Sequence, residues 1–526
     1  MSPLVVHTCD VLVVGAGASG AVVASRLSED GARQVLLLEA GPVVPIDEAA
    51  RRAMRNANQV AIAEGLNWKM RTSVRDESPA GGTWSYEAGK VVGGSSAVNA
   101  VQALRGMPRD YDDWALECGP EWSWRQVLPY FRAIENDPLG PNEVHGCAGP
   151  VPIRRERREE LTRLQAGLLD ACLAGGYAET EDHNHPDATG VGMIPKNVVD
   201  GLRMSAALTY LEQARARSNL RLIARAHVLW LLWNATGNCE GALVDIDGKV
   251  CRVHASQVVL CAGALNTPAL LMRSGVGCPS MLEPFAIKVR HALPSVGQNL
   301  MDHPSVGIWG VPAPGVCEFG EPYHQTLLRT TLGETGHAND VHIRVLAGID
   351  IRTVMPDRAG TDSTKAMAGM NVCLTNSWSC GSLRIASADP HAAPVVCLEL
   401  LRDPRDSVLL MHGLRLAWQL LHRVRMRPLF DQLIGWSDSM MASDMVLRRA
   451  IGAYVRPAAH LCGSVRMGRS PDSGAAVDPQ GRVFGVDNLW IADASVMPRA
   501  PSAPTHLTTL MVAEKIAAGI RRRHPR

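Results

Sequence analysis

Two histidines have the side chains and surroundings that could do chemistry. His460 stands among small and apolar residues in PAAHLCG (457–463), and His506 lies in a similar setting in APTHLTTL (503–510). An imidazole in such a place can be a hydrogen-bonded core residue, a metal ligand or a catalytic base. Neither histidine has a third ligand nearby at the usual spacing, so we predict no metal site. What the pair can do depends on what else the chain binds.

A glycine-rich turn near the N-terminus predicts a dinucleotide site. The stretch DVLVVGAGASGAVVASRLSEDGARQVLLLEAGP (10–42) predicts a strand (10–14), a helix (18–29) and a second strand (34–38). Its GxGxxG pattern consists of Gly15, Gly17 and Gly20, which allow a tight turn, close approach of a pyrophosphate and packing of helix on strand. Glu39 closes the second strand, where a carboxylate binds ribose hydroxyls and disfavours a 2′-phosphate. The motif predicts FAD or NAD and argues against NADP.

The elements that must position these residues come from both ends of the chain. A strand, glycine turn and helix are predicted in SQVVLCAGALNTPALLMRSGVG (256–277), a strand ending near Asp493 in 488–498, and an amphipathic helix in 503–523. The middle, 311–449, has short alternating strands and an amphipathic helix near 407–424. We therefore predict an α/β fold, in which a Rossmann-type domain contains an inserted α+β domain with an antiparallel sheet.

Composition excludes several classes of protein. The chain has 526 residues, of which 46% are hydrophobic and 20% charged, and a net charge of +1, so nothing argues for nucleic acid as a partner. Every apolar run is broken well before about 18 residues, so we expect no membrane span. The 13 cysteines are odd in number and scattered, without a CxxC pair. We interpret them as free thiols in a reducing cytoplasm, and we see no signal peptide.

Over nearly its whole length the chain resembles the glucose–methanol–choline (GMC) family of flavin oxidoreductases. Beyond the N-terminal motif, the similarity is carried in the family's order by GKVVGGSSAVNA (89–100), RDYDDWA (109–115), WSWRQVLPYF (122–131), RMSAALTYL (203–211), VVLCAGALNTPALLMRSGVG (258–277), LPSVGQNLMDHP (293–304), HLCGSVRMG (460–468) and VDNLWIADASVMPRAPSAPTHLTTLMVAEKIA (486–517). Bacterial hydroxymethylfurfural oxidases are the members it most resembles. The resemblance implies FAD, with an FAD-binding domain at 1–157, 190–310 and 450–526 and a substrate-binding domain at 158–189 and 311–449.

The resemblance also implies how FAD is held. Some members attach FAD covalently through a histidine in the Gly/Ser loop, but the matching position here is Val98, so we expect dissociable, non-covalent FAD. Val228 is expected to present its backbone to the adenine. The predicted FAD-binding residues are Gly15, Gly17, Ala18, Ser19, Gly20, Glu39, Ala40, Val92, Gly94, Ser95, Asn99, Ala100, Val228, Asp493, Ala494 and Thr505.

The two histidines acquire roles from the same resemblance. His460 stands where the family has its catalytic histidine, and His506 stands where many members have asparagine. Oxidation of an alcohol needs a base for the hydroxyl proton and an acceptor for the hydride. We expect His460 to be the base and His506 to hold the substrate oxygen, and two close imidazoles should not both be charged. The function implied is an FAD-dependent alcohol oxidase or dehydrogenase that acts on a primary alcohol, with benzylic and furanic alcohols as candidates. The electrons then pass to O₂ or another acceptor, and the histidine pair favours an oxidase.

Two alternatives stay open at this point. Plant hydroxynitrile lyases share this fold and a histidine pair without net redox chemistry, and a choline dehydrogenase-like activity is the other. The region 311–449 and the stretch 67–84 are expected to line the pocket, with Trp378 as a stacking candidate. These segments contain no acidic cluster that would indicate a cationic substrate. We interpret His303 as structural and DHNHPD (182–187) as a solvated loop.

Overall fold

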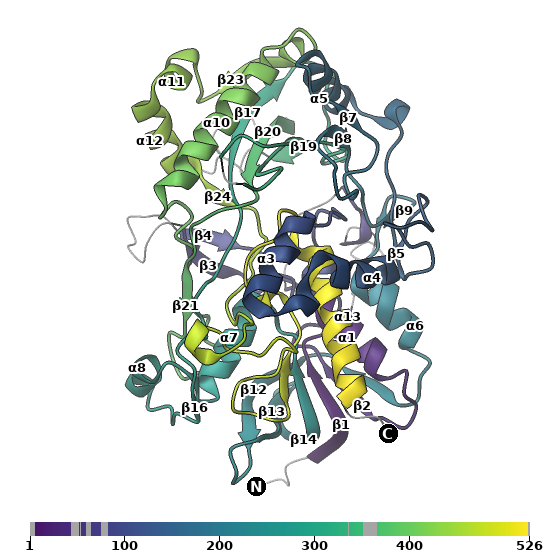
Figure 1. Cartoon of the computed structure of the whole chain (residues 1–526), viewed down its shortest axis with the longest axis vertical. Helices are drawn as coiled ribbons and strands as arrows, with labels where there is room; N and C mark the ends of the chain where they lie inside the picture. The colour runs from purple at the N-terminus through teal and green to yellow at the C-terminus, as the bar shows by residue number, and fades with distance from the viewer. Residues whose placement is uncertain are drawn as a thin grey trace.

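The computed structural model describes residues 6–43, 52, 54–58, 65–74, 83–334, 336–350 and 366–523. Two large sheets lie towards opposite ends of the long axis of the molecule, with helices packed beside each of them and in the middle (Figure 1). The N-terminal glycine turn belongs to one sheet, and the middle of the chain builds most of the other. This arrangement confirms the predicted α/β fold with a second, largely antiparallel sheet.

The first sheet has seven strands in the order β11-β2-β1-β14-β13-β12, with β25 paired to β14. Its central strands are parallel and buried on both faces, which explains their near-continuous apolar sequences. The strands are β1 (Val6–Val14), β2 (Val35–Leu38), β11 (Leu220–Ile223), β12 (Ala226–Trp233), β13 (Cys239–Ile246), β14 (Lys249–Leu260) and β25 (Leu489–Ile491). Helices α1 (Ala18–Leu27) and α13 (Thr505–Arg523) pack side by side on this sheet, although they come from the two ends of the chain (Figure 1).

The second sheet has eight strands in the order β23-β17-β20-β19-β18-β8-β7, with β24 paired to β17. They are β7 (Glu179–Thr180), β8 (Gly190–Met193), β17 (Pro304–Pro312), β18 (Thr326–Thr330), β19 (Val341–Asp350), β20 (Ala366–Leu374), β23 (Phe430–Ile434) and β24 (Arg456–Pro457). Helices α5 (Arg163–Ala174), α10 (Pro404–Leu421), α11 (Asp438–Ala442) and α12 (Asp444–Tyr454) gather at this end (Figure 1). The predicted helix near 407–424 is α10.

Smaller elements connect the two sheets. A four-stranded sheet contains β21 (Ser382–Arg384), β22 (Val395–Cys397), β3 (Met70–Ser73) and β4 (Thr83–Tyr86). The remaining helices are α3 (Pro108–Cys118), α4 (Trp124–Ile134), α6 (Glu212–Ala214), α7 (Gly263–Arg273) and α8 (Pro279–Leu282). Strand pairs are formed by β5 (Glu135–Asn136) with β6 (Val151–Pro152), β9 (Val198–Val199) with β10 (Leu202–Arg203), and β15 (Val276–Gly277) with β16 (His291–Ala292). Strands β8, β17 and β24 join the eight-stranded sheet, although the proposed FAD-binding segments include all or part of each, so the domain boundaries stay a prediction.

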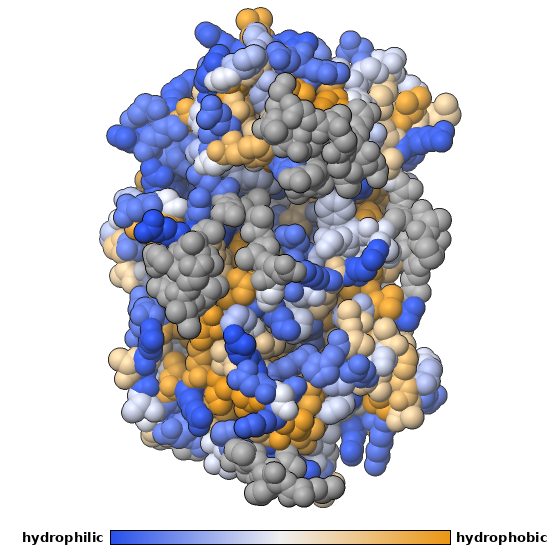
Figure 2. Space-filling view, turned by 180° about the vertical axis from the view of Figure 1, so that it is seen from behind, coloured by the Kyte–Doolittle hydropathy of each residue, from blue (hydrophilic) through white to orange (hydrophobic). Residues whose placement is uncertain are grey.

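The surface seen from behind mixes polar and apolar residues, with apolar atoms more frequent towards the end that holds the seven-stranded sheet (Figure 2). Among the residues that the structure describes, no helix is both long and apolar enough to cross a membrane.

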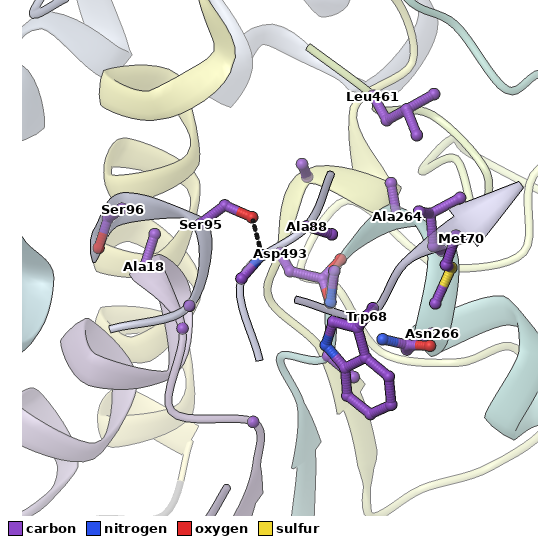
Figure 3. Close-up of a pocket in the computed structure, with 18 of the residues that line it drawn as sticks. Ala18, Trp68, Met70, Ala88, Ser95, Ser96, Ala264, Asn266, Leu461 and Asp493 are labelled. Carbon is purple, nitrogen blue, oxygen red and sulfur yellow. Dashed lines mark hydrogen bonds between the residues drawn. The ribbon is translucent and has the colours of Figure 1, made fainter. Parts of the chain in front are cut away.

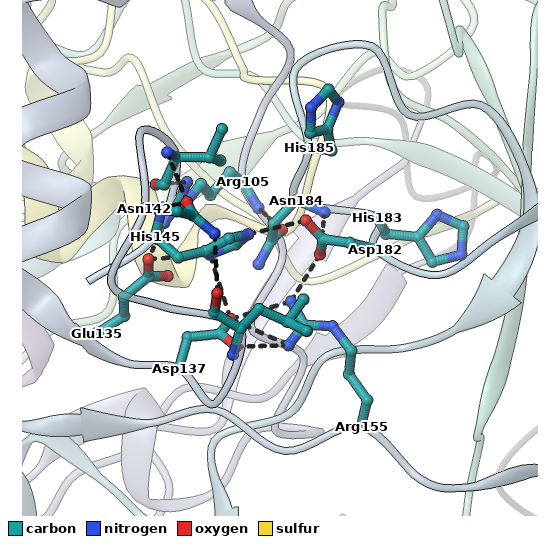
Figure 4. A network of polar contacts seen from close by, with 12 residues as sticks. Arg105, Glu135, Asp137, Asn142, His145, Arg155, Asp182, His183, Asn184 and His185 are labelled. Carbon is teal, nitrogen blue, oxygen red and sulfur yellow. Dashed lines mark hydrogen bonds and ion pairs between the residues drawn. The ribbon is translucent and has the colours of Figure 1, made fainter. Parts of the chain in front are cut away.

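A buried ion-pair network surrounds His145 (Figure 4). Its members are three carboxylates, two guanidinium groups and the imidazole: Glu135, Asp137, Asp182, Arg105, Arg155 and His145. The His145 Nδ1 atom lies 3.1 Å from Glu135, and Nε2 lies 2.9 Å from Asp182. With His145 protonated the six formal charges cancel, which a buried cluster requires. Although three of these side chains could contact a metal ion, the arginines already occupy the carboxylates.

The network overturns one expectation from the sequence. Asp182, His183 and Asn184 belong to the predicted solvated loop, yet His183 and Asn184 are buried. Asp182 pairs with His145 and with Arg155, and the His183 ring contacts the Leu327 carbonyl at 3.1 Å. The segment is polar because its side chains pair inside the protein, and composition alone cannot distinguish that from solvation.

Replacement of His145 by Gln should destabilise the protein in a pH-dependent way. Burial alone would lower the pKa of His145, but hydrogen bonds to Asp182 and Glu135 raise it to about 9. The stabilisation is therefore complete below about pH 6.5, the unfolded value, and is lost as the pH rises through about 9. We expect His145→Gln to cost about 2–3 kcal/mol at pH 6 and much less at pH 9.5, measured by urea unfolding. The exposed His185→Gln is the control, and equal losses at both pH values would refute the charged network.

Candidate active site

A cavity of about 540 Å³ lies between the two large sheets, and residues from both sheets line it. Part of its lining is drawn in Figure 3. This volume is typical of a pocket for a small molecule or cofactor. Its wall contains the glycine turn after β1, the loop 94–102, the turn that follows β14, and both candidate histidines. The cavity therefore joins a nucleotide-type site to a pair of imidazoles.

Close backbone contacts shape the nucleotide end of the cavity. Gly15 has a φ of 97°, and a Cβ there would lie 2.6 Å from the Cys261 carbonyl oxygen. A Cβ on Gly94 would lie 2.7 Å from the Cα of Gly17, so the two glycine loops can meet only without side chains. A Cβ on Gly20 would overlap the Gly15 carbonyl, which explains why Gly20 packs beneath the turn and does not line the cavity. Bare backbone along this wall suits the approach of a pyrophosphate.

Glu39 is fixed at the edge of the same wall. Its two carboxylate oxygens accept hydrogen bonds from the N–H groups of Ala16, at 2.9 Å, and Gly41, at 2.8 Å. Burial raises the pKa of Glu39 to about 7, and the backbone hydrogen bonds and the charge of Lys90 oppose that rise. Each carboxylate oxygen has a remaining lone pair, so the group fits a ribose that brings hydroxyl donors. The residues present therefore fit a dinucleotide such as FAD.

The loop after β4 brings small polar groups to the cavity (Figure 3). The Ser95 hydroxyl accepts a hydrogen bond from the Gly89 N–H at 3.2 Å. Asn99 accepts one from the Val101 N–H through its side chain, and its carbonyl accepts one from Arg203. Val98 lines the cavity and is nearly buried, whereas Val92 lies in the core outside the cavity wall. The loop thus presents bare backbone and small side chains where a planar ring could lie.

Asp493 connects two elements below the cavity. One carboxylate oxygen accepts from the Gly263 N–H and the Thr267 hydroxyl, at 2.8 and 2.6 Å, and the other accepts from Ser495. These bonds satisfy the N-terminus of α7 and the turn after β25. Asp493 therefore has a structural task as well as a place in the cavity wall.

Of the sequence-predicted site residues, all but Gly20 and Val92 line the cavity. Trp378 does not, because it carries the Arg405 guanidinium over its ring at 4.5 Å. The part of 67–84 that the structure describes supplies Trp68 and Met70 (Figure 3). Sequence reasoning missed the polar wall formed by Gln102 and Arg344, whose contact joins distant segments of the chain.

The candidate base His460 has a partner that the sequence interpretation missed. His303 Nδ1 lies 2.9 Å from His460 Nδ1, with the two rings nearly perpendicular at 74°. The sequence suggests only a structural role for His303, because it lies in a different motif, 157 residues before His460. The contact arises because residues 301–303 run beside 458–462, with hydrogen bonds between Met301 and Cys462 in both directions. Only the three-dimensional structure shows that His303 and His460 are in contact.

Both cavity histidines are held in the neutral form. Burial lowers the pKa of His460 well below 6.5, and the charges of His303 and Arg344 lower it further. Burial also lowers the pKa of His506 to about 4. At neutral pH each imidazole therefore has one nitrogen with a free lone pair, as a base requires.

The fold and the cavity together define a dinucleotide-dependent enzyme with an imidazole pair at the end of its cofactor site. Two family models, each described as GMC oxidoreductase, match residues 9–305 and 377–513. The 5-(hydroxymethyl)furfural oxidase of Methylovorus sp. is 34% identical over 97% of this chain and 98% of its own length. An oxygen-dependent choline dehydrogenase of Chromohalobacter salexigens is 32% identical over 98% of this chain and 95% of its own length. The crystal structure of pyridoxine 4-oxidase from Mesorbium loti superposes with a TM-score of 0.88 at 28% identity, covering 98% of this chain and 100% of that one.

The chain belongs to the GMC oxidoreductase family and is an FAD-dependent oxidoreductase. This confirms the resemblance on which the choice of FAD over NAD rested.

Substitution of Gly94 by Ala should weaken FAD binding. The new Cβ would press on Gly17 at a position where the φ of Gly94 is 52°, so the two glycine loops must separate. Gly201→Ala is a matched control, because Gly201 has a φ of 72° and open space around its Cβ position. We expect both variants to lose about 1 kcal/mol from backbone strain, and only Gly94→Ala to lose FAD affinity, by about tenfold or more, in a fluorescence titration of the apoprotein. Equal FAD affinities in the two variants would contradict a role for the close contact between Gly17 and Gly94 in FAD binding.

Proposed function

We propose that this FAD oxidoreductase oxidises the primary hydroxyl of a small alcohol to the aldehyde, with His460 as the base that removes the hydroxyl proton. The observation that carries the proposal is a neutral imidazole that lines the cofactor cavity while one of its two nitrogens is bound to His303. Hydroxymethylfurfural oxidase and pyridoxine oxidase, named among the relatives, support a hydroxymethyl group as the reacting part.

His303 sets which nitrogen of His460 is free. A hydrogen bond between two Nδ1 atoms contains one proton, which either ring could carry. Burial lowers the pKa of the His303 ring to about 4, and the Pro501 backbone, whose carbonyl can accept from the ring, partly opposes this. The other nitrogen of His303, Nε2, is buried and makes no hydrogen bond of ordinary geometry to the residues that the structure describes. Of the two possible arrangements, we propose the one in which His303 Nδ1 accepts from His460 Nδ1–H. The lone pair of His460 is then on Nε2, as a base in the cavity needs.

The reaction separates a proton from a hydride. FAD, when bound, supplies the acceptor for the hydride that leaves the substrate carbon. His460 Nε2 takes the hydroxyl proton, which makes the oxygen a better electron donor, and His303 continues to accept from Nδ1–H of the resulting imidazolium. His506, at the first turn of α13, offers a hydrogen bond to the substrate oxygen and orients the C–H bond. The aldehyde and two reducing equivalents on the cofactor are the products.

The acceptor and the cellular compartment complete the proposal. O₂ or another acceptor re-oxidises the cofactor, in keeping with relatives whose names include both an oxidase and an oxygen-dependent dehydrogenase. All thirteen cysteines are free thiols, which suits a reducing cytoplasm.

FAD should be released when the protein is denatured. The residue that occupies the family's attachment position, Val98, has no nucleophile, and we propose non-covalent binding for that reason. Acid precipitation should leave the yellow colour in the supernatant, and mass spectrometry should find the polypeptide at its unmodified mass. Flavin that stays with the pellet would disprove non-covalent attachment.

His460→Ala should slow reduction of the flavin by an alcohol about 10²–10⁴-fold, because general-base catalysis typically contributes that much. The measurement is anaerobic stopped-flow bleaching of the flavin band, with FAD content determined in parallel. His412→Ala is the control, since His412 is exposed on α10. A near-normal rate of flavin reduction in His460→Ala would show that His460 is not the base. Persistent yellow with cyanide release from mandelonitrile would identify a lyase.

The same assay distinguishes two roles of His303: fixing the tautomer of His460 by a hydrogen bond, and packing against it. His303→Asn can retain an oxygen acceptor for His460 Nδ1–H, whereas His303→Leu cannot. We expect the Leu variant to be slowed by about tenfold or more and the Asn variant to recover much of that loss, with FAD content unchanged in both. Equal rates in the two variants would refute the tautomer role.

A further inference from the structure

Arg344 is a cation in the cavity wall without a counter-ion among the described residues. It lies on β19, is half-buried, and lines the same cavity as His460. One terminal nitrogen donates a hydrogen bond to the Gln102 side-chain oxygen at 3.1 Å. Its Nε is buried and has no hydrogen-bond partner in the part of the chain that the structure describes. Five donors are therefore served there by a single neutral acceptor.

No carboxylate approaches Arg344 to ion-pair distance among the residues that the structure describes. Its cross-strand neighbours are the uncharged Leu327 and Asn371. The buried carboxylate beside the two histidines, Asp302, forms no ion pair with Arg344, and its oxygens accept from the N–H groups of His303 and His460 and from the Tyr86 hydroxyl. Within the described part of the chain, the positive charge of Arg344 therefore has no counter-ion.

Other arginines in this protein show how unusual this is. Arg105 and Arg155 pair with buried carboxylates. Arg203 donates to three carbonyls, and Arg273, which also lines the cavity, donates to two. A partly desolvated guanidinium with one amide contact is costly, because charges inside proteins are normally paired. A ligand that brings an anion would remove this cost.

The surroundings of Arg344 suit an anion. Gln102 accepts from Arg344 through its side-chain oxygen, so its NH₂ group remains as a donor in the cavity wall. Tyr323 lines the same cavity and lies within reach of the Arg344 charge. Guanidinium, amide and hydroxyl donors together are the groups that recognise a carboxylate or a similar oxyanion.

We propose that Arg344, with Gln102, binds an anionic group of the substrate, so that the preferred alcohols are hydroxymethyl compounds that carry a carboxylate. The inference rests on the proposed alcohol oxidation and names the substrate class of the same site. It sets this chain apart from a choline-type activity, because a cationic substrate would be repelled by Arg344. Its position near the base would direct the other end of the substrate, with the hydroxyl, to His460.

Equilibrium binding tests the anion site without turnover. Oxidised holoenzyme is titrated with benzoate and with its neutral isostere benzamide, and the change in flavin absorbance gives each Kd. We expect benzoate to bind about 10- to 100-fold more tightly, since hydrogen bonds to a charged group are worth that factor. Arg344→Met should abolish the preference, Arg344→Lys should retain part of it, and Arg402→Met, which removes a surface guanidinium that is 71% exposed, should leave it intact. Equal binding of the two probes by wild type, or an unchanged preference in Arg344→Met, would overturn the proposal.

Turnover then separates this inference from the proposed function. The acid 4-(hydroxymethyl)benzoate and its methyl ester are offered to wild type and to Arg344→Met, and the ratio of their catalytic efficiencies is measured in each. A wild-type preference for the acid that Arg344→Met removes supports both proposals. Oxidation of the ester without any preference for the acid refutes the anion site alone. Benzoate binding that depends on Arg344, with no flavin bleaching by either alcohol, supports the anion site and counts against alcohol oxidation.

Discussion

One buried carboxylate, Asp302, holds together the end of the cavity that contains His460. It accepts hydrogen bonds from the N–H groups of His303 and His460 and from the Tyr86 hydroxyl, and so joins three segments that are far apart in the chain. Burial raises the pKa of Asp302 to about 7, and these hydrogen bonds oppose the rise. The contact between the two imidazoles depends on this arrangement, because each ring is attached to a backbone that the carboxylate fixes.

The His145 network and the Arg344 site differ in how their buried charges are balanced. Around His145, carboxylates and cations cancel within the protein, so the network is closed and needs no ligand. At Arg344 the described residues supply one neutral hydrogen-bond acceptor and no counter-ion. The first arrangement supports stability, whereas the second costs stability in the free protein, and the anionic ligand that we propose would offset that cost.

Sequence reasoning is strongest where a local pattern has a single physical meaning. The glycine turn, Glu39 and the apolar parallel strands can be predicted because backbone approach and double-sided burial constrain residue type directly. His303 and Arg344 cannot be assigned from sequence, since their significance lies in partners brought near by strand pairing between distant segments. The prediction for the polar segment 182–187 is wrong for the same reason: buried pairing and solvation select the same residue types.

The two cavity histidines are attached to different halves of the molecule. The segment of His460 continues from β24, which pairs with β17 in the eight-stranded sheet. His506 lies in the first turn of α13, which packs against α1 beside the seven-stranded sheet. The gap between the imidazoles is therefore a property of how the halves dock. Substitutions beneath α10 or α12 that tilt the second sheet would widen or narrow that gap. The size of the alcohol that we propose as substrate can thus evolve at positions remote from the cavity, with both histidines unchanged.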